Sequence, residues 1–186
     1  MGKRLFVSVD LDGLAAELAT IQERFADASG FDTTDPRQAH VTLQFLGDTD
    51  PERVDALVDE LERAVDGSGV DPFTAHFEGL GVFPSTDYIE VVWLGVGAGS
   101  AELAALHETI EERTTAMGFE PDDHEFTPHV TLGRMRHAGG KELVQEVVRE
   151  HDPSAGDLRV EAVRLTESVL TDEGPEYSTV ASIPLD

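Results

Sequence analysis

Apolar and polar residues follow two different periods along the chain, and the two periods succeed one another in a regular order. From Leu5 to Leu11 apolar residues alternate with polar ones, as in a strand with one buried face. A helical apolar period follows over residues 14–25 and ends at Gly30. The chain is therefore predicted to begin with a strand followed by a helix.

The same two periods predict the remaining elements. Further strands are expected at residues 39–47, 73–83, 88–97 and 127–135, and a terminal hairpin at residues 158–170 and 177–185. Further helices are expected from Pro51 to Val65, from Ser100 to Gly118 and from Lys141 to Glu150. Strands and helices are therefore mixed along the whole chain.

The order strand, helix, strand occurs twice, over residues 4–47 and again over residues 88–135. Strands mixed with helices at this spacing are typical of an α+β fold. We predict one bilobal domain over residues 1–186, with a duplicated arrangement in which two antiparallel sheets face a central cleft and helices pack outside. The pattern does not assign the last strands to either half.

The charge balance is unusual for a globular chain. It has 38 acidic and 13 basic residues, a formal charge of −25, and two of the basic residues are lysines. Self-repulsion of such a chain fades at molar salt, where the Debye length is about 3 Å. The acidic residues lie on the polar sides of amphipathic segments, so we interpret them as a solvated surface adapted to a salt-rich cytoplasm rather than as disorder.

Several classes of protein are excluded by composition. The chain has no cysteine, which excludes disulfides, thiolate zinc sites and cysteine nucleophiles. No apolar run approaches the roughly 18 residues that span a bilayer, and residues 1–8 lack the apolar region of a signal peptide. No glycine-rich phosphate loop of the P-loop or dinucleotide-binding type and no Gly-x-Ser-x-Gly elbow is present. We expect a cytoplasmic protein without membrane contact.

One short motif occurs in both halves. His40-Val41-Thr42-Leu43 recurs as His129-Val130-Thr131-Leu132, each time within a predicted strand. Residues i and i+2 of a strand point to the same face, so each copy offers one imidazole and one hydroxyl side by side. A single copy is uninformative, since threonine favours strands and a buried histidine is often simply hydrogen-bonded. Two copies in equivalent positions favour a functional role for the motif over a chance occurrence.

The two residue types suit chemistry at a phosphodiester. Histidine changes its protonation near its ordinary pKa of about 6.5, so two histidines across a substrate can act as general base and general acid. Threonine hydroxyls can donate hydrogen bonds to phosphate oxygens. Metal binding is the rival use of two histidines, but zinc typically takes three or four protein ligands. His124 is the one residue that could be recruited, and it lies in an acidic loop.

The two motif segments resemble the paired signatures of the 2H phosphoesterases. The segments are residues 40–47, HVTLQFLG, and residues 126–134, FTPHVTLGR. Within that superfamily the chain is most similar to the RNA 2′,3′-cyclic phosphodiesterases, once called 2′-5′ RNA ligases, over residues 3–185. The resemblance implies a bilobal α+β fold and hydrolysis of a terminal 2′,3′-cyclic phosphate on RNA to a 2′-phosphate. It implies no metal, no nucleotide cofactor and no obligate protein partner.

The resemblance also implies roles for single residues. His40 would be the general acid that protonates the departing 3′-oxygen, and His129 the general base that activates water. Thr42 and Thr131 would bind the phosphate oxygens, and Arg134 would add positive charge.

Three aromatic residues near the motifs have open interpretations. Phe45 occupies in the first motif the position of Arg134 in the second, and it could stack on a nucleobase. We favour the simpler interpretation that Phe45 is a core residue, and we also interpret Trp93 as core. Tyr177 is undecided.

One property conflicts with the resemblance. RNA binding normally relies on a basic surface, whereas this chain is strongly acidic. The conflict eases if the protein grips the terminal phosphate and one or two bases. Two other functions stay open: hydrolysis of a small cyclic phosphate, and a non-catalytic module that binds RNA ends.

Overall fold

The structure is a computed structural model that describes residues 2–122 and 125–185. In these ranges thirteen strands and α-helices follow one another largely as predicted. The strands are β1 (Lys3–Asp10), β2 (Phe31–Thr33), β3 (His40–Thr49), β4 (Phe73–Pro84), β5 (Ile89–Val96), β6 (His129–Met135), β7 (Ser154–Val160), β8 (Ala162–Thr171) and β9 (Gly174–Pro184). The helices are α1 (Ala15–Gln22), α2 (Val54–Ser68), α3 (Ser100–Ala116) and α4 (Lys141–Glu150).

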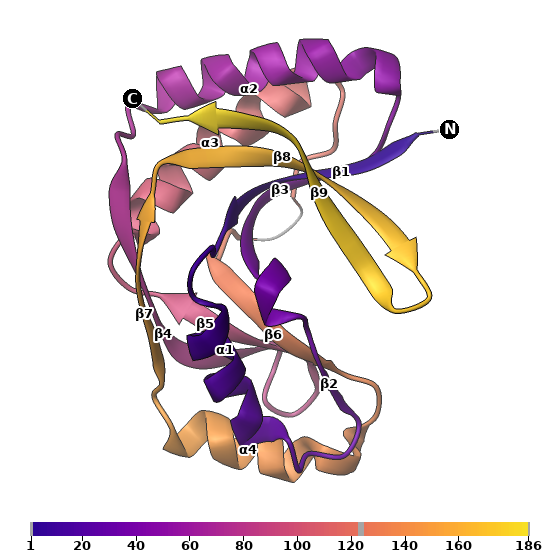
Figure 1. Ribbon diagram of the computed structural model, residues 1–186, viewed down its shortest axis with the longest axis vertical. Coiled ribbons are helices and arrows are strands. Elements are labelled where there is room, and N and C mark those ends of the chain that lie inside the picture. The colour runs from indigo at the N-terminus through magenta and orange to yellow at the C-terminus, as the bar shows by residue number, and fades with distance from the viewer. Residues whose placement is uncertain (1, 123–124, 186) are drawn as a thin grey trace.

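The strands of the described ranges form one nine-stranded antiparallel sheet (Figure 1). Its order is β7-β4-β5-β6-β3-β1-β8-β9, and β2 pairs with β6. The prediction of two sheets was therefore wrong, because the described strands form one sheet. The reason is one pairing between the motif strands, Val41 of β3 with Val130 of β6. This pair joins a half built from β1, β3, β8 and β9 to a half built from β2, β4, β5, β6 and β7.

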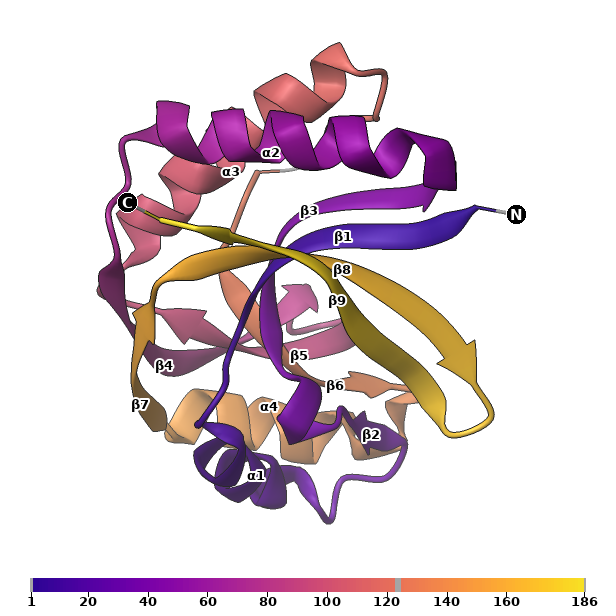
Figure 2. The same ribbon diagram turned by 45° about the horizontal axis from the view of Figure 1, so that its top comes forward.

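The helices lie outside the curled sheet, as predicted (Figures 1 and 2). α2 and α3 pack on each other beside the half that contains β3, and α1 and α4 lie beside the half that contains β6. α1 follows β1 in the chain but packs against β6 and β7, and α3 follows β5 but packs against β3. Both helices thus cross to the other half, and one continuous apolar core includes residues of both halves. The α+β class is confirmed, while the bilobal, duplicated arrangement stays a prediction.

Two details of the chain path differ from the prediction. The segment expected as one strand at residues 158–170 divides at Glu161 into β7, which pairs with β4, and β8, which pairs with β1. The alternation changes phase at this point, from Leu158 and Val160 to Val163 and Leu165, and the prediction of one continuous strand overlooked that change. The three-residue strand β2 was not predicted because it is too short to show a period. In the described ranges no helix is long and apolar enough to cross a membrane.

Candidate active site

The two motifs meet at their second residues. Val41 and Val130 are paired and fully buried, each with 0% exposure. Neighbouring residues of a strand point to opposite faces, so the histidine and threonine that flank each valine face away from the core. All four of these side chains are partly exposed. The fold therefore brings both predicted pairs to one surface.

The antiparallel direction of this pair decides which groups are neighbours. His40 precedes Val41 while Thr131 follows Val130, so these two lie on the same side of the joining pair. By the same argument Thr42 lies on the side of His129. Each histidine is thus accompanied by the threonine of the other motif as well as by its own. The arrangement is a pseudo-symmetric set of two imidazoles and two hydroxyls.

A β-bulge follows the threonine in the first motif strand. On β1 the neighbours Ser8 and Val7 pair with Thr42 and Gln44, which leaves Leu43 as the extra residue. The extra residue reverses the alternation of faces, so Gln44 is buried where a regular strand would expose it. The residue after Gln44 therefore returns to the face of the motif.

That residue is Phe45, and the prediction of a core position for it was wrong. Phe45 pairs with Phe6, which lies on the same face as Ser8, and its side chain is 46% exposed. The guanidinium carbon of Arg4 lies 5.2 Å from the centre of the Phe45 ring. The regular period assigns Phe45 to the core face, and the bulge moves it to the motif face.

The second motif strand contains the equivalent bulge at Leu132. On β5 the neighbours Trp93 and Val92 pair with Thr131 and Gly133, and the next residue Val91 pairs with Arg134. Since Val91 and Trp93 share a face, Arg134 shares the face of Thr131. The structure thus places the predicted cation Arg134 on the motif surface.

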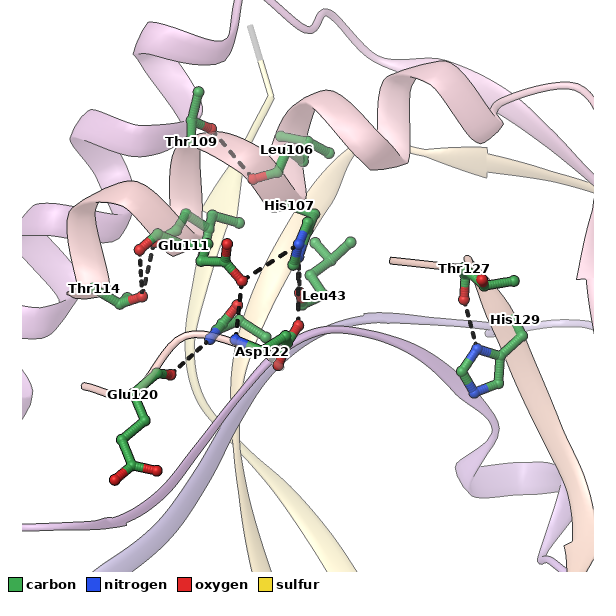
Figure 3. A network of polar contacts seen from close by, with 12 residues as sticks. Leu43, Leu106, His107, Thr109, Glu111, Thr114, Glu120, Asp122, Thr127 and His129 are labelled. Atoms are coloured by element: carbon green, nitrogen blue, oxygen red, sulfur yellow. Dashed lines mark hydrogen bonds and ion pairs between the residues drawn. The ribbon is translucent and has the colours of Figure 1, made fainter. Parts of the chain in front are cut away.

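Both motif histidines are held in the same way. The Nδ1 atom of His40 lies 3.0 Å from the carbonyl of Gln38. The Nδ1 atom of His129 lies 2.6 Å from the carbonyl of Thr127, as Figure 3 shows. A carbonyl only accepts hydrogen bonds, so Nδ1 carries the proton in each ring. Proton exchange with a substrate is therefore left to Nε2, in the same orientation in both motifs.

His40 lies in an aromatic recess. Its ring centre is 4.9 Å from that of Phe6 and 5.1 Å from that of Tyr177, which meets it edge-on. Burial lowers the pKa of His40 below its usual 6.5, while the bond to Gln38 and the charge of Asp10 act in the opposite direction. Tyr177, undecided from the sequence, is therefore part of the surroundings of His40.

Asp10 belongs to a polar network that was not predicted. Its carboxylate accepts hydrogen bonds from Ser8 at 2.9 Å and from Arg164 at 2.6 Å. Ser8 in turn lies 3.0 Å from the hydroxyl of Thr166, and Arg164 also binds Asp12 at 2.8 Å. The network connects β1 to β8, far apart in sequence, so no local pattern could have linked its members.

His129 is surrounded by a second aromatic pair. Phe83 meets the imidazole edge-on at 5.0 Å between ring centres, and Trp93 lies at 5.8 Å. Trp93 is partly exposed on the motif face, so the prediction of a core position for it was wrong. Its ring covers Gly81 of β4, where a Cβ atom would come within 2.2 Å of the indole. Glycine at this position makes room for the tryptophan next to His129.

The charge of one half acts on a titratable group of the other half across the motif surface. Burial raises the pKa of the Tyr177 phenol above 10, and the positive charge of Arg134 opposes that shift. Tyr177 comes from β9, in the half of the first motif, whereas Arg134 comes from the second motif strand. Residues of both halves therefore contribute to the motif surface.

A sequence model of the 2′-5′ RNA ligase superfamily matches residues 11–171 of this chain. The chain belongs to that superfamily.

Individual members of the superfamily are similar over most of their length. An RNA 2′,3′-cyclic phosphodiesterase of Aeropyrum pernix is 34% identical over 152 residues, which are 81% of this chain and 84% of the relative. An RNA 2′,3′-cyclic phosphodiesterase of Archaeoglobus fulgidus is 33% identical over 176 residues, 94% of this chain and 96% of the relative. The crystal structure of the Thermus thermophilus protein TT0787 is 26% identical, has a TM-score of 0.80 and covers 98% of this chain and 97% of that one.

Outside the motif surface of this superfamily member, another histidine connects the two motifs from behind. His107 of α3 is buried, and its Nδ1 atom donates to the carbonyl of Leu43, the bulge residue, at 2.7 Å (Figure 3). Its ring stacks on Phe126, three residues before His129, with centres 4.2 Å apart. His107 is therefore a buried, hydrogen-bonded histidine of the core.

His107 also belongs to a group of possible metal ligands. Together with Glu111 and Asp122 it places three ligand atoms within 4.8 Å of one another. In the described ranges this is the one group of its kind, and neither motif histidine belongs to it. His124, the further ligand considered from the sequence, lies outside the described residues.

Proposed function

We propose that this protein hydrolyses the terminal 2′,3′-cyclic phosphate of RNA to a 2′-phosphate and a 3′-hydroxyl. The observation that carries the proposal is the pairing of Val41 with Val130, which gathers two histidines and two threonines on one face. Similar members of the superfamily are named RNA 2′,3′-cyclic phosphodiesterases, which supports this substrate class.

The two histidines divide the proton transfers. His129 takes a proton from water through Nε2 as the water oxygen forms a bond to phosphorus. The bond between phosphorus and the 3′-oxygen breaks, and His40 gives its Nε2 proton to that oxygen. The 2′-oxygen keeps the phosphate, and one proton has passed to His129 while another has left His40. A later exchange of protons with solvent restores both rings.

The remaining motif residues hold the phosphate and the base. The hydroxyls of Thr42 and Thr131 donate to the non-bridging oxygens, where negative charge gathers in the transition state, and Arg134 adds a full positive charge. Phe45 offers an exposed ring for stacking on a nucleobase, a contact worth about 1–3 kcal/mol in single-strand binding.

The same geometry also serves ligation. A 5′-hydroxyl of a second RNA takes the place of water, and attack on the cyclic phosphate gives a 2′-5′ linkage and a free 3′-hydroxyl. His129 and His40 keep their roles in this direction and exchange them when the 2′-5′ linkage is broken again.

The experiment is a product assay on an oligonucleotide that ends in 2′,3′-cyclic phosphate, with EDTA and molar KCl. We expect the wild type to release the 2′-phosphate, and we expect His40→Ala and His129→Ala each to lose at least about a hundredfold in kcat, the lower range of general acid–base contributions. Circular dichroism establishes that both variants are folded. His151→Ala, at an exposed histidine, is the matched control.

The outcomes separate this proposal from its rivals. Turnover of a small cyclic phosphate derived from ADP-ribose, without turnover of RNA, would show that the substrate is a small cyclic phosphate and not RNA. Tight binding of the RNA end by folded wild type without any product would indicate a non-catalytic module. Near-normal rates in both histidine variants would contradict the mechanism.

A further inference from the structure

We propose that a groove next to Arg134 binds the RNA nucleotide that precedes the cyclic phosphate. This inference rests on the proposed function and extends it from the RNA end to the chain behind it. The groove lies between residues 87–90, at the start of β5, and residues 134–141, at the end of β6 and the start of α4. Its volume is about 390 Å³, within the roughly 300–1,000 Å³ typical of small-ligand sites.

The groove is continuous with the motif surface through Arg134. The bulge at Leu132 places Arg134 on the face of Thr131, and the same arginine lines the groove. By contrast, the recess beside His40 has a volume of about 90 Å³. That recess is too small for a nucleotide, so an RNA chain with its end at the motifs needs a path elsewhere. The groove supplies one that begins at the phosphate-binding arginine.

The groove is rich in positive charge, against the trend of the molecule. Arg134, Arg136 and Lys141 are three of the ten residues that line it, whereas the whole chain has 13 basic residues in 186. Two carboxylates, Asp87 and Glu90, are among the ten. This is the local charge that a phosphodiester needs in a protein whose net charge repels RNA.

The cations of the groove differ in how far their charges are already compensated. Arg136 donates to the carboxylate of Asp32 at 2.7 Å, with 63% of its side chain exposed. Lys141 donates to the carbonyl of Asp87 at 3.1 Å, a neutral group that leaves its charge in place. Lys141 is therefore a stronger candidate than Arg136 for contact with the phosphate.

An exposed aromatic ring completes the groove. Tyr88 lies at its edge with 64% of the residue exposed. The pairing of a cationic channel with an aromatic ring is the usual means of binding single strands, with phosphates on the cations and a base on the ring. The groove thus contains both parts.

The two walls of the groove are tied together before any ligand binds. Besides the bond from Lys141 to Asp87, the side-chain amide of Gln145 donates to the carbonyl of Thr86 at 2.5 Å. Both bonds connect α4 to the turn between β4 and β5. A preformed groove lowers the ordering cost of binding.

The test compares a 2′,3′-cyclic mononucleotide with trinucleotides that carry the same cyclic end. We expect wild-type kcat/KM to be higher on the trinucleotide. Tyr88→Ser and the double variant Arg136→Gln/Lys141→Gln are each expected to lose about tenfold on the trinucleotide while the rate on the mononucleotide changes less than about twofold. The double variant should also flatten the dependence of KM on salt.

A double control removes two positive charges elsewhere. Arg149→Gln/Arg159→Gln changes exposed residues outside the groove, one of them near the far end of α4, and should behave as wild type on both substrates. Equal losses of kcat/KM on both substrates in the groove variants, or no loss on the trinucleotide, would contradict the proposed role of the groove. If the wild type turned over neither substrate, the proposed function itself would be wrong. Failure of the groove proposal and failure of the proposed function therefore give different results.

Discussion

The chemistry of each motif histidine is set by a few neighbours that lie outside the motif. Gln38 and Thr127 hold Nδ1 of the two rings, and Phe6 and Phe83 pack against them. His40 differs from a solvated histidine because burial lowers its pKa and Asp10 counteracts that effect. An acid must be protonated when substrate binds, so Asp10 helps His40 in the role proposed for it.

Asp10 can be tested by its effect on the pH profile. Asp10→Asn removes a negative charge that raises the pKa of His40, so that pKa falls further. If His40 is the acid, the alkaline limb of kcat/KM against pH moves to lower pH, and activity falls at neutral and higher pH. Asp12→Asn, which breaks the other ion pair of Arg164 at an exposed carboxylate, should leave the profile in place.

The same measurement assigns the two roles. Should the acidic limb move to lower pH in Asp10→Asn, His40 would act as the base and His129 as the acid. A profile that does not move at all would show that His40 does not titrate in the catalytic step.

At this scale the sequence identified the histidines and threonines but not their surroundings. The repeated motif predicted that the histidine and threonine of each copy share a face, whereas the pairing of Val41 with Val130, which puts all four on one sheet, was not predicted. The network around Asp10 depends on the pairing of β1 with β8, two strands from opposite ends of the chain. Patterns within a single sequence carry no such pairing. Whether these residues act in catalysis stays a prediction.

At the scale of elements, the two bulges explain why the motif extends over six residues. In a regular strand the residue five after the histidine would face the core, whereas the bulges at Leu43 and Leu132 turn Phe45 and Arg134 to the motif face. Periodicity assumes an unbroken alternation, and this is why it failed for Phe45. The positions of β3 and β6 themselves were predicted because long alternating segments are the strongest sequence signal.

The bulge of β3 is held by α3, and this support can be measured. His107→Ala leaves the Leu43 carbonyl without its donor and removes the ring that packs on Phe126, so we expect a loss of about 1–3 kcal/mol in the free energy of unfolding. His107→Asn places an amide near the position of Nδ1 and should lose less. Urea denaturation at fixed KCl measures both, with kcat/KM recorded beside it.

The variant Phe126→Leu separates the contribution of the ring stacking from that of the hydrogen bond to Leu43. It weakens the stacking but keeps the hydrogen bond from His107 to Leu43, so its effect on kcat/KM should be smaller than that of His107→Ala. Equal stability of the wild type and His107→Ala would show that α3 does not support the motif strand.

At the scale of the whole molecule, acidic residues greatly outnumber basic ones, and the groove is a local exception. No described Asp or Glu is buried, and the sequence contains 38 acidic but only 13 basic residues. Helix α2 shows the consequence, because Asp55, Asp59, Glu62 and Asp66 are all exposed and stand three or four positions apart on one face. Like charges at this spacing destabilise a helix at low salt.

Salt should therefore stabilise the fold, and α2 offers a way to test the cause. We expect the free energy of unfolding to rise between 0.1 and 2 M KCl as screening shortens the range of repulsion. The variant Glu62→Lys converts the two repulsive pairs of Glu62, with Asp59 and with Asp66, into attractive ones. It should gain about 0.2–0.5 kcal/mol per pair at 0.1 M KCl, and less at 2 M. Glu62→Gln, which removes the charge without adding one, should lie between the wild type and the lysine variant. Urea titrations at the two salt concentrations measure the free energy of unfolding of all three proteins. A wild-type stability that is independent of KCl would contradict the interpretation of the surface as salt-adapted. A salt dependence in both variants that equals that of the wild type would place the effect outside α2.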